Sequence, residues 1–157
     1  MQLRKQPSIH PKEKEIVAKV YSSALFGIEA YPIEVEVDLA RGLPRFSIVG
    51  LPDLAVKEAR ERVSSAIKNS SFTFPTRKIT VNLAPADIKK EGSSFDLSIA
   101  IGILKASDVV TGDELSHYSI LGELALDGSV RRINGALPIA LELKKRGVKA
   151  LILPEEN

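Results

Sequence analysis

A pair of serines in front of an apolar helix has the clearest potential for chemistry. Residues 82–105 read NLAPADIKKEGSSFDLSIAIGILK, so a polar loop leads from a predicted strand to Ser93 and Ser94. The helix that follows is apolar on nearly every side, which predicts that it lies inside the domain. The positive end of its dipole favours a developing negative charge, so a reactive serine would be well placed there. The alternative is that Ser93, Ser94 or Asp96 only caps this helix.

Other catalytic and metal-binding patterns are missing from the sequence. There is no cysteine, which excludes disulfides, thiol catalysis and cysteine metal sites. The two histidines, His10 and His117, lie in the N-terminal tail and in a predicted loop, without metal-ligand spacing. A Ser-His-Asp triad built on His117 would need unusual geometry. Neither G-x-x-x-x-G-K-[S/T] nor G-x-G-x-x-G occurs, so we expect no ATP hydrolysis by this chain alone. Because the histidines lack ligand spacing and cysteine is absent, we also expect no metal site.

Positive charge is concentrated in the middle of the chain. Between Arg41 and Lys90 there are ten Lys and Arg against four Asp and Glu, a net charge of +6 in a chain whose total is +2. Cations in loops or at strand ends are the best candidates for contacts with phosphates, since they are less committed to pairs within a helix. These candidates are Arg41, Arg45, Arg77, Lys78, Lys89 and Lys90. The alternative is that they only solvate an ordinary surface.

The elements that must position these residues follow from periodicity and from turn signals. Alternating or continuous apolar runs predict strands, and apolar stripes with caps predict helices. Strands are expected at 16–25, 33–39, 46–51, 79–83, 118–121 and 148–153, with a tight hairpin at Asp127-Gly128. Helices are expected after the cap Asp53, after Ser94, and after the cap Asn134, with Pro138 in the first turn and Gly147 at the end. Strands and helices do not alternate regularly, so the predicted class is α+β.

Length and composition set the domain organisation. A chain of 157 residues is long enough for one domain with a sizeable core. Residues 1–15 are polar and without periodicity, so we expect a flexible arm there and one domain over 16–157. There is no 18-residue apolar run and no signal-peptide core, so we expect a cytoplasmic protein.

Three long strings carry a resemblance to a known family. They are VYSSALFGIEAYPIEVEVDLARGLPRFSIVGLPDLAVKEARERV, ITVNLAPADIKKEGSSFDLSIAIGIL and LGELALDGSVRRINGALPIAL. Together they resemble the N-terminal domain of the magnesium-chelatase-like AAA+ ATPases, the ComM/YifB group. The resemblance implies a bacterial, cytoplasmic, hexameric ATPase that uses ATP and Mg²⁺ in a following AAA+ module. It also implies helicase activity that drives branch migration of DNA in natural transformation.

The same stretch is similar to the Lon protease fold, which implies a two-layer arrangement of a sheet and packed helices. In active Lon proteases a serine and a lysine form the catalytic pair. The resemblance places Ser94 at the nucleophile position and Leu137 at the lysine position. Leucine cannot accept a proton, and Lys144 is seven residues further along the helix, about 10.5 Å of rise. Ser94 is therefore expected to cap the helix, and a lysine at 137 is expected to be buried and destabilising.

The resulting interpretation is a non-catalytic, Lon-like α+β domain that serves DNA contact or ring assembly. If Arg77, Lys78, Lys89 and Lys90 converge near the mouth of the core, they form a phosphate-binding surface. Two alternatives stay open at this point. One is a Ser-Lys peptidase that uses Ser94, and the other is a pure protein-interaction module.

Overall fold

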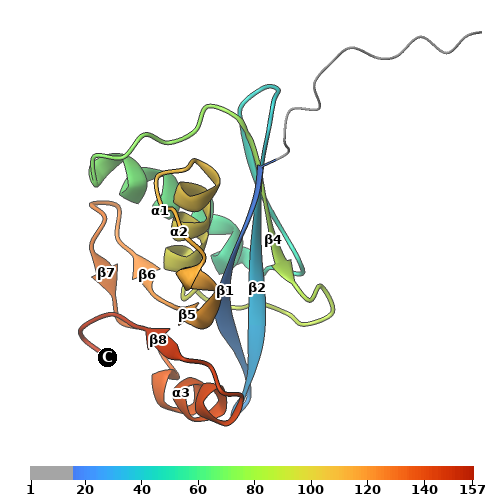
Figure 1. Ribbon diagram of the computed structural model, residues 1–157, viewed down its shortest axis with the longest axis vertical. Helices are drawn as coiled ribbons and strands as arrows, with labels where there is room; N and C mark the ends of the chain where they lie inside the picture. The colour runs from blue at the N-terminus through green and yellow to red at the C-terminus, as the bar shows by residue number, and fades with distance from the viewer. Residues whose placement is uncertain (1–15) are drawn as a thin grey trace, which may run out of the picture.

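A six-stranded mixed sheet forms the centre of the computed structural model, which describes residues 16–157 (Figure 1). The arm predicted at 1–15 lies outside the described residues. The strand order is β3-β4-β2-β1-β5-β8. These strands are β1 (Ile16–Phe26), β2 (Glu29–Ala40), β3 (Arg45–Val49), β4 (Lys78–Ala84), β5 (Tyr118–Ile120) and β8 (Ala150–Ile152). β2 runs antiparallel to both β1 and β4, whereas β3–β4, β1–β5 and β5–β8 are parallel pairs.

Two helices cover one face of this sheet (Figure 1). They are α1 (Leu54–Asn69) and α2 (Asp96–Ala106). Between them and the sheet lies the main core, which takes the alternate residues Ile33, Val35, Val37 and Leu39 from β2. The other face of β2 carries the acidic residues and is partly exposed, as the alternation predicts. Gly102 packs so closely that a Cβ there would lie 2.7 Å from Val37 Cγ2.

The third helix lies at the far end of the β1–β2 hairpin (Figure 1). α3 (Ala136–Lys145) packs into a second, smaller cluster that includes Ala30, Leu121, Ile133, Ile139 and Leu143. The short strands β6 (Glu123–Leu124) and β7 (Val130–Arg131) form a separate hairpin around Asp127-Gly128, and η1 (Glu114–His117) precedes β5. The mixture of layers and connections confirms the α+β class.

The caps of the helices divide into one confirmed and two wrong predictions. Asp53 caps α1, since its Oδ1 accepts a hydrogen bond from Val56 N at 2.8 Å. The N-cap of α2 is Phe95, so the prediction that a serine side chain caps this helix is wrong. The N-cap of α3 is Gly135 in the left-handed region, where Asn134 was predicted. In both cases the capping position falls on a residue without a suitable side chain.

Candidate functional site

The ends of three strands bring most of the predicted phosphate contacts together. Lys78 is the first residue of β4, and it pairs with Ala40 at the end of β2 on one side and with Arg45 at the start of β3 on the other. The connection 41–44 must therefore cross over the start of β4. Arg45 N also donates to Arg77 O at 3.4 Å, which fixes the two segments side by side. We name this set, Arg41, Arg45, Arg77 and Lys78, the cationic end.

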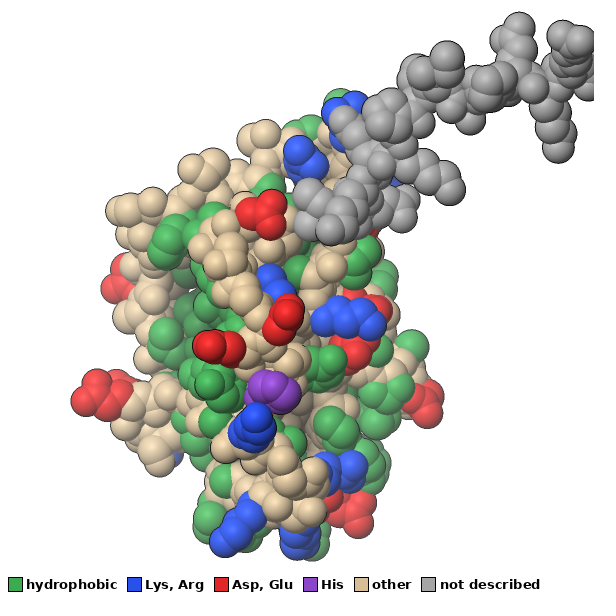
Figure 2. Space-filling model, in the orientation of Figure 1, with side chains coloured by type: hydrophobic (Ala, Val, Ile, Leu, Met, Phe, Trp, Pro, Cys, Tyr) green, Lys and Arg blue, Asp and Glu red, His purple; other side chains and the backbone are tan. Residues whose placement is uncertain are grey.

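The cationic end is open to solvent. Residues 41–45 and 76–78 are all exposed, and Lys and Arg side chains are visible at the upper end of the molecule in Figure 2. Arg45, Arg77 and Lys78 form no ion pair with another of the described residues 16–157. The nearest acid that shares a cavity with Arg77 is Asp108. Three or more unpaired cations on one surface attract an anion with many charges.

Lys89 and Lys90 do not belong to this surface. They follow the C-terminal end of β4, whereas Arg77 and Lys78 lie at its start, and the seven residues of that strand span about 20 Å. The predicted convergence of these four residues is therefore wrong. Lys89 is also paired, with its Nζ 2.8 Å from Glu91 Oε1.

Lys90 is a buried structural residue, and its prediction as a phosphate contact is wrong. Its side chain has no exposed area. The ammonium donates to the carbonyl oxygens of Gly50, at 2.8 Å, and of Pro85. Its backbone also donates to Leu51 O and accepts from Asp53 N. Burial lowers the pKa of Lys90, as expected for an ammonium that has left water.

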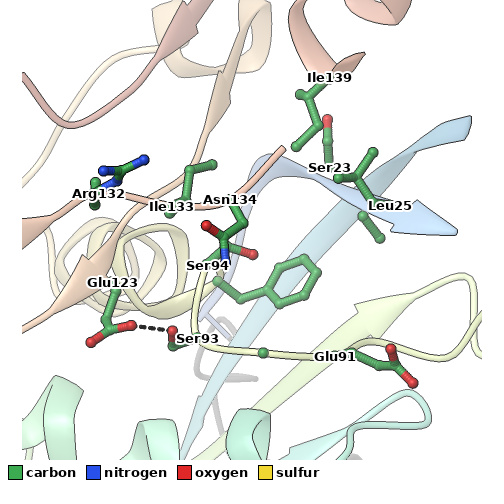
Figure 3. Close-up of a pocket in the computed structure, with 13 residues that line it drawn as sticks. Ser23, Leu25, Glu91, Ser93, Ser94, Glu123, Arg132, Ile133, Asn134 and Ile139 are labelled. Atoms are coloured by element: carbon green, nitrogen blue, oxygen red, sulfur yellow. Dashed lines mark hydrogen bonds between the residues drawn. The ribbon is translucent and has the colours of Figure 1, made fainter. Parts of the chain in front are cut away.

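The loop that carries Ser93 and Ser94, here the serine loop, borders a cavity of about 400 Å³, here the serine cavity (Figure 3). Ser93 donates a hydrogen bond to Glu123 Oε2, and Arg131 Nη1 lies 3.5 Å from Glu123 Oε1. The lining consists of Ser23, Ala24, Leu25, Glu91, Gly92, Ser93, Ser94, Phe95, Glu123, Arg132, Ile133, Asn134 and Ile139. None of these residues is a lysine or a histidine, so Ser94 has no amine or imidazole base beside it.

Ser94 and Leu137, which the resemblance places at the serine and lysine positions of Lon proteases, both lie differently from what the sequence predicts. The backbone carbonyl of Ser94 accepts from Gly122 N at 2.9 Å, which ties the serine loop to the segment before β6. Leu137 is 70% exposed and does not line the cavity, so the prediction that a lysine at 137 would be buried is wrong.

Asp96 has a role that sequence reasoning missed. It was considered as a cap for α2, but its carboxylate is buried and accepts two hydrogen bonds from Arg62, at 2.6 and 3.0 Å. It also accepts from Leu124 N at 3.1 Å. The Asp96 carboxylate raises the pKa of Arg62. This ion pair joins α1 to the start of α2. The one signal for it in the sequence is an aspartate at the start of a helix that is apolar on nearly every side.

Two further features, a metal-binding cluster and a membrane-spanning helix, are not found among the described residues. Within residues 16–157 no group of three or more His, Asp or Glu side chains is arranged to hold a metal ion. Over the same range, none of the helices is both long enough and apolar enough to cross a membrane.

Comparison with known proteins places the chain in a family. Residues 35–157 match the family described as subunit ChlI of Mg-chelatase, and the chain belongs to this family. It is 50% identical to YifB of Escherichia coli over 138 residues, which cover 88% of this chain and 27% of YifB. It is 47% identical to the competence protein ComM of Haemophilus influenzae over 141 residues, 90% of this chain and 28% of ComM. The chain thus spans about a quarter of the length of these relatives.

A more distant similarity supports the fold. Lon protease 2 of Bacillus subtilis is 28% identical over 138 residues, which cover 80% of this chain and 25% of that protease. The Lon-like α+β fold predicted from the sequence is consistent with this relationship and with the mixed sheet described above.

Proposed function

We propose that this chain is the N-terminal domain of a longer ComM/YifB-type AAA+ ATPase, and that it contacts the DNA backbone through the cationic end. One observation carries the proposal. Lys78 pairs with both Ala40 and Arg45, so three strand ends gather exposed cations, of which Arg45, Arg77 and Lys78 form no ion pair with a described acid. Contacts with phosphate need no base recognition, and such a surface would bind DNA of any sequence.

The affinity of one domain should be low. Non-specific binding of this kind has a Kd of roughly 10⁻⁴–10⁻⁶ M at physiological salt. A hexameric ring in the cytoplasm would present several cationic ends to one DNA molecule, and the apparent affinity would then rise about 10²-fold or more. Branch migration of DNA in natural transformation is the process that the resemblance to the ComM/YifB group implies. The residues of this chain include no phosphate-binding loop, so ATP and Mg²⁺ would bind in the AAA+ module of the longer protein.

We propose that the domain itself is non-catalytic. The support lies in the serine cavity, where Ser94 has no lysine or histidine among the lining residues. The lysine nearest in sequence, Lys90, uses its ammonium to hold Gly50 and Pro85. The Ser-Lys peptidase alternative therefore lacks, within the described cavity, the lysine that its mechanism needs.

Ring assembly is a second candidate function, and a different surface favours it. Leu137 and Leu141 are one turn apart on α3, and they are 70% and 54% exposed. Apolar side chains at this spacing form a stripe that a neighbouring protein surface could cover. This surface lies at the opposite end of the molecule from the cationic end, so the two functions do not exclude each other (Figure 1).

A titration of fluorescently labelled duplex DNA tests the DNA proposal. The test variant is Arg45→Ala/Lys78→Ala. The control, Lys89→Ala/Lys144→Ala, removes the same charge from exposed positions outside the cationic end. We expect binding by the wild type and the control at low salt, and at least tenfold weaker binding by the test variant. Equal binding by all three proteins would exclude the cationic end as the DNA site.

A further inference from the structure

We infer that Leu43 is an apolar wedge that enters the DNA base stack while the cationic end holds the phosphates, so that the domain prefers DNA with a branch or a helix end. This inference rests on the proposed DNA contact and specifies which form of DNA the site recognises.

The first observation is the exposure of Leu43. Its side chain is 88% exposed, and every residue of 41–45 around it is exposed as well. Isolated exposed leucines are common on protein surfaces, so exposure alone carries nothing. The informative feature is the setting, because Leu43, followed by Pro44, forms the apolar tip of a loop whose ends are Arg41 and Arg45.

The second observation is the path of the loop. β2 and β3 are both neighbours of β4, so their ends stand about 10 Å apart with the start of β4 between them. Residues 41–44 bridge this distance above Lys78, and Arg77 lies beside Arg45. The apolar tip is thus placed over the middle of a group of cations.

The third observation concerns the two residues that flank Leu43 in the loop. Gly42 has a φ of +138°, a value that favours glycine, although no atom would obstruct a Cβ there. Pro44 fixes its own φ and restricts the residue before it, which is Leu43. The backbone at Leu43 and Pro44 therefore has fewer conformations to lose when DNA binds, which lowers the entropy cost of binding.

The chemistry of this arrangement matches a known mode of DNA contact. Proteins that deform DNA insert apolar side chains such as leucine or proline between base steps, while nearby arginine and lysine contact phosphates. Separating stacked bases is unfavourable, and it is least so where the bases are already unpaired or mismatched. A wedge therefore turns a sequence-independent phosphate contact into a preference for forks and branches.

Two variants test the wedge without disturbing the phosphate contacts. Leu43→Ser removes the apolar tip, and Leu43→Met retains apolar character and length. Position 43 is exposed, so both variants should unfold at the wild-type temperature, which thermal melting checks. One substrate is a continuous duplex, and the other is a forked DNA whose double-stranded part has the same sequence. The fork carries a 2-aminopurine beside the fork point, and the duplex carries one at the equivalent position.

We expect the wild type and Leu43→Met to bind the fork severalfold more tightly than the duplex, and to increase the fluorescence of the 2-aminopurine as its neighbours unstack. Leu43→Ser should bind both substrates with the affinity of the wild type for the duplex and leave the fluorescence unchanged. If Leu43→Ser keeps the preference and the fluorescence change, the wedge is wrong, although the DNA proposal stands as long as Arg45→Ala/Lys78→Ala binds more weakly. If the wild type binds neither substrate at low salt, the DNA proposal fails, and the wedge fails with it.

Discussion

Lys90 Nζ donates a hydrogen bond to the backbone carbonyl of Gly50 at 2.8 Å, forty residues earlier in the chain. This contact joins the connection before α1 to the loop before α2. Gly50 can take its position only because it has no side chain, since a Cβ would lie 2.2 Å from Leu83 O. Lys90 therefore holds these two connections together, and it is not available to phosphate.

Replacing Lys90 should destabilise the fold severely. Lys90→Ala would leave the carbonyls of Gly50 and Pro85 without their donor and would open a cavity, at a combined loss of about 3 kcal/mol in the free energy of unfolding. Lys90→Met fills the space and should lose less. Urea denaturation measures both, with the exposed Lys89→Ala as the control, expected to change stability by about 0.5 kcal/mol or less. A Lys90→Ala protein as stable as this control would show that the buried contacts contribute nothing.

Ser94→Ala should have little effect on stability. A capping serine would contribute about 1 kcal/mol, but the N-cap of α2 is Phe95, and Ser94 is tied down through its backbone carbonyl. We therefore expect a change within about 0.5 kcal/mol by urea denaturation. The same protein preparations should show no cleavage of unfolded casein. Cleavage by the wild type that disappears in Ser94→Ala would contradict the non-catalytic account.

Leu137→Lys should be tolerated and should remain inactive. Because Leu137 is 70% exposed, a lysine there would stay in water and keep its charge without a burial penalty. It would not line the cavity that contains Ser94, so it would not activate the serine. A serine-directed fluorophosphonate probe reports the outcome, and labelling of Leu137→Lys above the background of Ser94→Ala would prove this geometry wrong.

The contribution of Asn82 to stability should disappear in acid. The Asn82 amide donates to Glu36 Oε2 at 2.7 Å and, with a smaller effect from Lys19, holds the pKa of Glu36 below its ordinary value of 4.5. A carboxylate with a depressed pKa in the folded state stabilises the fold at pH values above its unfolded pKa. That stability is lost as the pH falls through the folded pKa.

The measurement for Asn82 is a difference between two proteins at several pH values. Asn82→Ala should be less stable than the wild type by about 1 kcal/mol at pH 7, and this difference should shrink as the pH falls below 4.5. Thr80→Ala, on the same face of β4, controls for general effects of substitution and should show a difference that does not vary with pH. A constant difference for Asn82→Ala would mean that Glu36 is not the group involved.

Local patterns predicted most of the fold because local physics determines it. The alternation of Ile33, Val35, Val37 and Leu39 requires one buried face, and the structure buries all four side chains. The cap Asp53 and the apolar stripe of α1 depend on residues within a few positions of one another. The boundaries of short strands were less certain, and the last strand is three residues long where six were predicted.

The candidate site was harder to predict because it depends on contacts between distant residues. Lys90 looked like a surface residue and Asp96 like a capping residue. In the structure Lys90 donates to Gly50, 40 positions away in the sequence, and Asp96 accepts from Arg62, 34 positions away. Lys78 and Lys89 are close in sequence, yet β4 separates them by most of its length. Conversely, Arg45 and Lys78 are far apart in sequence and directly paired in the sheet. Charge along the sequence therefore located the basic region but not the surface.

The salt dependence of DNA binding tests the central claim most directly, because the slope of log K against log[salt] counts the phosphates that cations neutralise. Each of Arg45→Ala, Arg77→Ala and Lys78→Ala should reduce the magnitude of this slope by about one, and Lys89→Ala should leave it unchanged. Slopes that are equal for all four variants and the wild type, or a change with Lys89→Ala alone, would contradict DNA contact through the cationic end.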